Sequence, residues 1–364
     1  EGSLSCGVGT CNVMGTATTM AVIAEVLGMA LPGSALLPAS SAQRAAMAEA
    51  TGRAIVDRTR AGTAPDQVIS SAALENAFRA VCAVGGSTNT LLHLQAVAGR
   101  LGRRLIVEKL QAISGTTPVI ADVRPSGRHF LHDLEADGGV SALMGRLAEI
   151  CHLDALAGND RPWKESALID AVTVTGCLRT LAEPAGPAGS LAVLTGSLAP
   201  ATALLKRSAA SPKLCRHRGR AIVFDGVEDL RVRIDDPELQ VDDTSVLVLR
   251  GAGPVGGPGM PEVGHLPIPR KLLDRGVNDM LRISDARMSG TATGTVVLHV
   301  APEAAVGGPL ALVRDWDEIE LDADALRLDL LVPEDELARR RAKPLPRSND
   351  ARGYGRLYRD HVQQ

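Results

Sequence analysis

The chain has 364 residues, of which 45% are hydrophobic and 22% charged, with a formal net charge of -3. This composition suits a globular protein of two domains and gives no electrostatic reason to expect a nucleic-acid partner or an anionic membrane surface. Aromatic residues make up 2%, so platforms for stacking nucleobases are nearly absent. Apolar runs end before the ~20 residues that a membrane span needs. We therefore expect a cytosolic protein that acts on a small molecule.

The first part of the chain is predicted to combine helices with short strands. Patterns of apolar and helix-forming residues predict helices over residues 16–27, 41–59, 71–84 and 90–98. Short apolar runs at 105–107 and 119–120 favour strands, which gives an α/β region. The turn over residues 85–89 could cradle an anion on its backbone N–H groups, although a capped connection between two helices is the simpler interpretation.

After about residue 165 the sequence changes to short β-prone runs separated by Gly and Pro. These runs lie at residues 172–174, 191–194, 221–224, 245–249 and 295–298. Helical patterns persist at 200–205 and 271–276, so a barrel with inserted helices fits better than a plain sandwich. The expected fold is an α/β first region, residues 1–165, followed by a β-rich barrel-like domain with inserted helices, residues 166–364.

Six cysteines are spread along the chain without a Cys-x-x-Cys pair, which favours reduced thiols over a disulfide framework. Cys11 stands out because it follows a glycine-rich lead and precedes a predicted helix. The positive end of a helix favours a thiolate, so Cys11 suits a metal ligand, and an inert thiol is the commoner alternative. The thiols in apolar or loop contexts are expected to be buried and inert; they are Cys82, Cys151, Cys177 and Cys215.

Two glycine-rich loops of the second region could carry chemistry. Residues 251–262 hold five glycines and three prolines and end on Glu262, which could ligate a hard cation such as Mg²⁺. A flexible loop that faces solvent is the alternative. In residues 284–294, Ser289 and Thr291 could present hydroxyls to a ligand, although Ser289 also suits an ordinary turn. A serine is a poor base, so catalysis by Ser289 requires a metal ion or a cationic neighbour.

Taken together, residues 9–20, 85–89, 257–262 and 284–290 resemble motifs of the dihydroxy-acid and sugar-acid dehydratase family, in the family's order. The form around Cys11, with residues 216–220 and 301–304, is closer to the aldonate branch, which dehydrates acids such as arabinonate or xylonate. The resemblance implies a hydro-lyase with a 2Fe-2S cluster and Mg²⁺ as cofactors. It implies that Cys11 is a cluster ligand, Glu262 a magnesium ligand, Ser289 the base for the C2 proton, and Thr291 a substrate-binding residue.

The chain also departs from the family's pattern. Two further cluster cysteines, acidic magnesium ligands and a carbamylated lysine precede the matching cysteine in the family, and these motifs are not found before Cys11. The resemblance therefore implies a C-terminal portion, inactive by itself, of a homo-oligomeric enzyme. A branched-chain dihydroxy acid is the alternative substrate, and a non-catalytic assembly domain is the alternative function. Trp316 stands where the family usually has glycine. The resemblance therefore does not predict the geometry of the turn at this position.

Overall fold

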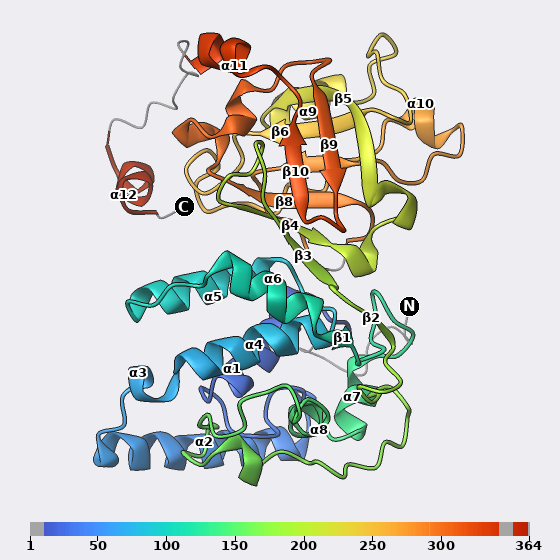
Figure 1. Ribbon diagram of the computed structural model, residues 1–364. Helices are drawn as coiled ribbons and strands as arrows, with labels where there is room; N and C mark the ends of the chain where they lie inside the picture. Colours follow the sequence, from blue (N-terminus) through green and yellow to red (C-terminus); the bar gives the residue numbers. More distant parts are fainter. Residues whose placement is uncertain (1–10, 291, 342–351, 363–364) are drawn as a thin grey trace. The chain divides into compact units, whose positions relative to one another are not determined.

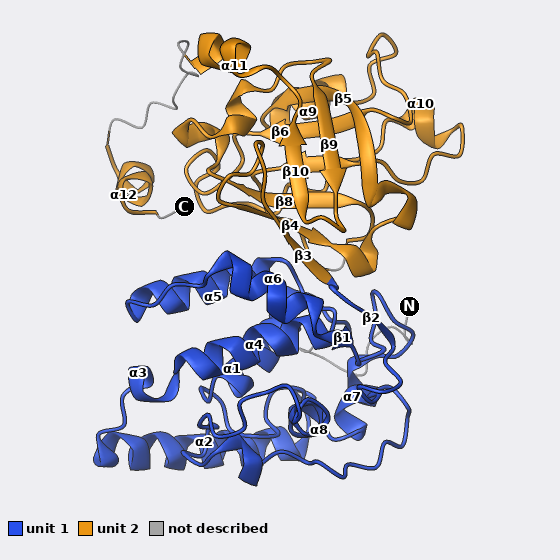
Figure 2. Ribbon diagram, in the orientation of Figure 1, with its two compact units in different colours: residues 1–190 blue, residues 191–364 orange. Residues whose placement is uncertain are grey.

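The computed structural model describes residues 11–290, 292–341 and 352–362. The chain divides into two compact units, residues 1–190 and 191–364 (Figure 2). The assignment of domains to residues 1–165 and 166–364 stays a prediction. Within the described ranges, every helix is too short or too polar to cross a membrane.

Unit 1 is built mainly from helices (Figure 1). They are α1 (Thr16–Val26), α2 (Ala42–Ala61), α3 (Pro65–Val68), α4 (Ser71–Ala83), α5 (Asn89–Arg100), α6 (Val107–Gly115), α7 (Leu131–Ala136) and α8 (Gly139–Arg146). The mostly buried α4 contacts α1, α5 and α6 and forms the centre of the unit. The four predicted helices are confirmed. The prediction of a strand at 105–107 is wrong, because this apolar run leads directly into α6.

One short pair of strands completes the described part of unit 1. Strand β1 (Pro118–Val119) pairs antiparallel with β2 (Gly186–Ala188), which confirms a strand at the predicted 119–120 run. The prediction of a strand at 172–174 is wrong, and Val172 and Val174 are 83% and 74% exposed. Alternating apolar residues thus face solvent here instead of a sheet.

A single carboxylate holds this irregular segment. Asp137, directly after α7, is 1% exposed and accepts hydrogen bonds from the backbone N–H groups of Val174 and Thr175, both at 2.8 Å. It also accepts from the N–H of Leu178 at 3.0 Å and from the hydroxyl of Thr175 at 2.9 Å. Burial alone would raise the pKa of Asp137, but the donors from Leu178 and Thr175 hold it below its usual value.

Unit 2 contains one mixed sheet that curves into a nearly closed barrel (Figure 1). Its strands are β3 (Leu191–Leu194), β4 (Thr202–Lys206), β5 (Arg216–Asp225), β6 (Val246–Arg250), β7 (Arg282–Ser284), β8 (Val296–Ala301), β9 (Glu318–Asp322) and β10 (Arg327–Leu330). Their order is β10-β9-β5-β6-β7-β8-β4-β3, with parallel pairing from β5 to β8. Thr195, directly after β3, bridges to Arg327 of β10 and so connects the two end strands.

The barrel confirms the expected fold class and four of the predicted strands, at 191–194, 221–224, 245–249 and 295–298. The predicted helix at 200–205 is wrong, because this run forms β4. Strand β4 pairs with β3 on one edge and β8 on the other, and its residues from Ala203 to Lys206 are all buried, so its apolar residues are continuous. A short continuous run of this kind does not distinguish a buried helix from a buried strand.

Alternate residues of the central strands face two separate cores. Val223 and Val248 belong to the cluster that contains residues of every strand of the sheet, whereas Phe224 and Leu249 pack outward. Helix α9 (Val227–Arg233), in the crossover between β5 and β6, and α10 (Arg270–Leu273) cover the outer cluster. The helical pattern predicted at 271–276 corresponds in part to α10. Further helices are α11 (Glu334–Arg341) and α12 (Tyr354–His361).

The turn before β9 keeps a backbone conformation that glycine would favour. Trp316 has φ 75°, in the left-handed region, and its side chain is half-exposed. The N–H of Trp316 donates to the carbonyl of Ala221 at 2.8 Å, and Asp315 accepts from the N–H of Val223 at 2.6 Å. These bonds tie the turn to β5, so the left-handed geometry persists although the residue is not glycine.

Replacing Asp137 with asparagine tests whether this carboxylate holds the 174–178 segment. We expect Asp137→Asn to lower the free energy of unfolding at pH 7 by about 2 kcal/mol, because the amide offers one acceptor oxygen to four donors. The folded pKa lies below the usual 3.8, so the carboxylate stabilises the fold above that pH and loses its effect as the pH falls further. Urea unfolding at pH 7 and in acid should therefore show a difference that shrinks in acid.

The matched control is Asp154→Asn, since the side chain of Asp154 is 87% exposed and pairs with the exposed Lys164. It should change the free energy of unfolding by less than about 0.5 kcal/mol. Equal effects of the two substitutions would contradict the role of Asp137.

Candidate functional site

The glycine- and proline-rich loop after β6 is held by two buried carboxylates, Asp285 and Glu303. The donors to Asp285 are the backbone N–H groups of Gly251, Ala252 and Ala304, each at 3.0 Å, and those to Glu303 are Val255 at 2.6 Å and Gly256 at 2.9 Å. Burial raises the pKa of Asp285 to about 6, and its three donors oppose the rise. Asp285 is therefore ionised at neutral pH, and the loop has a defined shape.

A second set of contacts joins this loop to the one that carries Ser289. The Nε of Arg287 donates to the carbonyl of Met260, and the N–H of Gly264 donates to the carbonyl of Arg287 at 2.8 Å. Glu262 lies between the two contact points, and Ser289 follows Arg287 by two residues. The structure thus brings together the loops that carry these two predicted site residues.

Only glycine permits this approach at position 264. A Cβ there would lie 2.5 Å from the Cδ2 of Leu298 and 2.9 Å from the carbonyl oxygen of Arg287. Both distances are shorter than ordinary van der Waals contact, and the second is to backbone that cannot rotate away. The spacing between the two loops therefore depends on the missing side chain.

The predicted residues of unit 2 differ in exposure. Glu262 is exposed, Ser289 is half-buried, and Thr291 lies outside the described residues. Lys206, at the end of β4, is 4% exposed, and its Nζ donates to the carbonyl of Gly290 at 3.3 Å. Burial lowers the pKa of Lys206 to about 8, so its ammonium form still predominates at neutral pH. The sequence analysis missed this lysine because it assigned the preceding run to a helix.

Cys11 belongs to unit 1 and is exposed. Its thiol donates to the carbonyl of Val13 at 3.6 Å, and it lies five residues before the first residue of α1. The segment is anchored on a neighbouring loop, since the N–H of Met14 donates to the carbonyl of Arg124 at 2.8 Å. The N–H of Leu131 also donates to the carbonyl of Asn12 at 3.1 Å. Cys11 is therefore held by backbone bonds at a surface.

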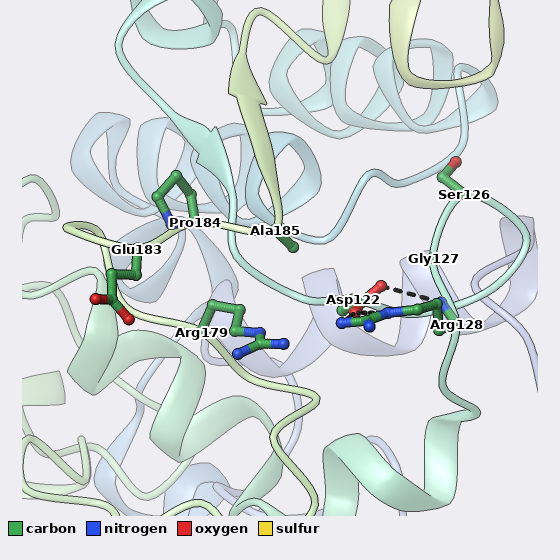
Figure 3. A pocket seen from close by; sticks show the side chains of 8 residues that line it. All are labelled: Asp122, Ser126, Gly127, Arg128, Arg179, Glu183, Pro184 and Ala185. Carbon is green, nitrogen blue, oxygen red and sulfur yellow. Dashed lines mark hydrogen bonds and ion pairs between the residues drawn. The ribbon is translucent and has the colours of Figure 1, made fainter.

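The same loop borders a polar pocket of about 470 Å³ within unit 1 (Figure 3). Its lining residues are Asp122, Ser126, Gly127, Arg128, Arg179, Glu183, Pro184 and Ala185. Arg128 pairs with Asp122, with Nη2 and Oδ2 2.6 Å apart, and the guanidinium of Arg179 lies nearby in Figure 3. The pocket therefore combines both signs of charge, and the sequence analysis did not predict it.

The turn at residues 85–89 is part of the packing between helices. Asn89 donates from Nδ2 to the hydroxyl of Thr16 at 2.9 Å, and the N–H of Ser87 donates to the hydroxyl of Thr19 at 3.2 Å. The hydroxyls of Thr16 and Ser87 also lie 2.9 Å apart. Ser87 and Asn89 are buried, so their polar groups join α5 to α1. This favours a connection between two packed helices over the anion cradle, although Thr88 at the start of α5 makes no side-chain cap.

The described residues do not complete a ligand set for either expected cofactor. Burial raises the pKa of Cys82, Cys151 and Cys177 to about 12, which keeps these thiols protonated and inert. Cys11 is thus the exposed thiol among the described cysteines. Within the described part of the chain, no group of three or more His, Cys, Asp or Glu residues is arranged to hold a metal ion. Cys11 and Glu262 could each contribute only one ligand.

The difference in exposure predicts selective alkylation of the metal-free protein. Iodoacetamide should modify Cys11 while the chain is folded, and it should modify Cys82 and Cys177 only after unfolding, because access and thiolate formation both limit the reaction. Peptide mass spectrometry of native and urea-unfolded samples measures this. Equal rates for Cys11 and Cys82 in the native protein would contradict the described burial.

Comparisons with known proteins identify the family. The dihydroxy-acid/6-phosphogluconate dehydratase N-terminal model matches residues 1–166, and the C-terminal model matches residues 176–364. The expectation that the chain is a C-terminal portion is not borne out, because the N-terminal and the C-terminal domain models of the family both match it. The 6-deoxy-6-sulfo-D-gluconate dehydratase of Pseudomonas putida and the L-arabinonate dehydratase of Rhizobium leguminosarum are each 45% identical over 100% of this chain.

The dihydroxy-acid dehydratase of Ignicoccus hospitalis is 42% identical over 94% of the chain. The chain spans 64%, 63% and 62% of the lengths of these three relatives, in the order named. The two family models together match nearly every residue. The chain therefore belongs to the dihydroxy-acid/6-phosphogluconate dehydratase family.

Proposed function

We propose that this chain acts in the dehydration of a sugar acid, an aldonate, to a 2-keto-3-deoxy acid. The observation that carries the proposal is the contact between the Glu262 loop and the Ser289 loop through Arg287. Two buried carboxylates, Asp285 and Glu303, hold the Glu262 loop in its shape. The names of the relatives from Pseudomonas putida and Rhizobium leguminosarum support a sugar acid as substrate.

The proposed reaction is an elimination without a change of oxidation state overall. The C2–H bond breaks and its proton passes to the base, the C3–O bond breaks and hydroxide leaves, and the new C2=C3 bond forms an enol. The enol tautomerises to the 2-keto acid, and the hydroxide takes up the proton to leave as water. Ser289 is proposed as the base, since its half-buried position in a braced loop can hold a hydroxyl at a fixed point beside C2.

The family resemblance supports a 2Fe-2S cluster and Mg²⁺ as cofactors, with Cys11 and Glu262 each contributing one ligand. Such groups supply Lewis acidity when bound. The described residues complete neither ligand set, so we assign no step to these groups and expect the 364-residue chain to be inactive by itself. The homo-oligomeric state, the cytosolic location and the binding of substrate by Thr291 also remain predictions.

A branched-chain dihydroxy acid is the second candidate substrate. The observation in its favour is the 42% identity to the dihydroxy-acid dehydratase of Ignicoccus hospitalis. Both candidates carry hydroxyls on C2 and C3 next to a carboxylate, so the same elimination applies to each. The substituent on C3 therefore distinguishes them.

We expect the dehydratase activity of the natural protein to depend on Ser289. With arabinonate or xylonate as substrate, we expect Ser289→Ala to lower kcat at least about 1,000-fold, because the proton at C2 loses its acceptor. Release of 2-keto acid measures turnover. Ser40→Ala, an exposed serine of unit 1, is the control and should keep wild-type activity.

Turnover of the branched-chain dihydroxy acid alone would contradict the aldonate assignment. Full activity of Ser289→Ala would contradict the role of Ser289 and leave the substrate assignment intact.

A further inference from the structure

Lys206 is a buried cation whose only described partner is a backbone carbonyl. Its ammonium donates to Gly290, and among the described residues it has no ion pair with a carboxylate. Removing a charge from water costs free energy that one neutral acceptor does not restore. An apolar side chain would fill the end of β4 at lower cost, so the retained charge points to a functional role.

The backbone around Lys206 is tied to the Ser289 loop at a second and a third point. The N–H of Gly294 donates to the carbonyl of Ala209 at 2.9 Å, and the N–H of Ser211 donates to the hydroxyl of Thr295 at 2.9 Å. The segment after β4 therefore lies alongside residues 294 and 295, directly before β8. These contacts hold the segment that follows Lys206 beside the residues that lead into β8.

Charged groups on the neighbouring elements are already paired. Arg207, next to Lys206, forms an ion pair with Asp324 at 2.6 Å, and Arg282 of β7 forms one with Asp279 at 2.8 Å. Asp285 accepts three backbone N–H groups, as described above. Among the described residues Lys206 forms no ion pair, and the positive charge of its ammonium lies beside the carbonyl of Gly290, the residue after Ser289.

We propose that Lys206 is a positioning residue for Ser289: it fixes the Gly290 peptide and supplies the positive charge that a serine needs to act as a base. A nearby cation favours the ionised form of a hydroxyl, and the effect is strong where water is excluded. Lys206 would be the cationic neighbour, one of the two alternatives, with a metal ion, on which catalysis by Ser289 depends. The inference rests on the proposed function.

The test compares Lys206→Met and Lys206→Arg in the cofactor-loaded natural protein, with substrate carrying hydrogen or deuterium at C2. We expect Lys206→Met to lower kcat about 100-fold with KM changed less than about 3-fold, since the charge acts on the proton transfer and not on binding. The deuterium isotope effect on kcat should be well above 1, because proton abstraction becomes rate-limiting. Lys206→Arg keeps the charge and should recover part of kcat.

Lys271→Met is the matched control, because Lys271 of α10 also donates to backbone carbonyls, at Pro237 and Leu239, but away from the Ser289 loop. It should leave kcat and the isotope effect unchanged. Thermal unfolding checks the fold, and Lys206→Met should melt no lower than wild type because it removes an unpaired buried charge. If Lys206→Met does not fold, Lys206→Gln takes its place with the same expectation.

Three outcomes would overturn the inference. They are wild-type kcat in Lys206→Met, a loss of kcat with an isotope effect near 1, and a loss that Lys206→Arg does not recover at all. In each case an inactive Ser289→Ala would leave the proposed function standing. If the wild-type protein dehydrates neither an aldonate nor a branched-chain dihydroxy acid, the proposed function fails and the inference fails with it.

Discussion

The structure of unit 2 depends on buried carboxylates that accept hydrogen bonds from a glycine-rich backbone. A loop with five glycines in residues 251–262 has large conformational freedom, and its ordering costs more entropy than that of most segments. Asp285 and Glu303 offset this cost, because five N–H groups of the loop and its surroundings converge on their oxygens. Glu262 is consequently presented from a defined loop at the surface.

Unit 1 uses the same device at another place. Asp137 accepts hydrogen bonds from the N–H groups of residues 174, 175 and 178, in a segment without regular secondary structure. In both units a carboxylate replaces the partner that a sheet or helix would give to these N–H groups. An irregular segment can thus be as well determined as a strand, which matters where loops carry the candidate site residues.

The barrel explains why these loops meet. Parallel strands β6, β7 and β8 are neighbours, and the loops that carry Glu262 and Ser289 follow β6 and β7 in the chain. Parallel order places the ends of these strands at one edge of the sheet, where Arg287 and Gly264 then set the spacing. Lys206 reaches the same loop from β4, which pairs with β8.

Periodicity and turn-forming residues in the sequence predicted helices α1, α2, α4 and α5 and four barrel strands, because these are local properties of the chain. The stretches that carry Cys11, Glu262 and Ser289 were likewise found from local motifs. Local patterns failed where long-range contacts decide the conformation. The run before Lys206 forms a strand because its two edges pair with β3 and β8. Residues 172–174 are irregular, and the N–H of Val174 donates to Asp137 instead of to a strand. Asp285, Glu303 and Lys206 have roles that no spacing predicts, since each depends on partners from other strands and loops. The sequence by itself thus determined which loops carry the proposed site residues, and only the tertiary structure decided which carboxylates and which cation lie beside those loops.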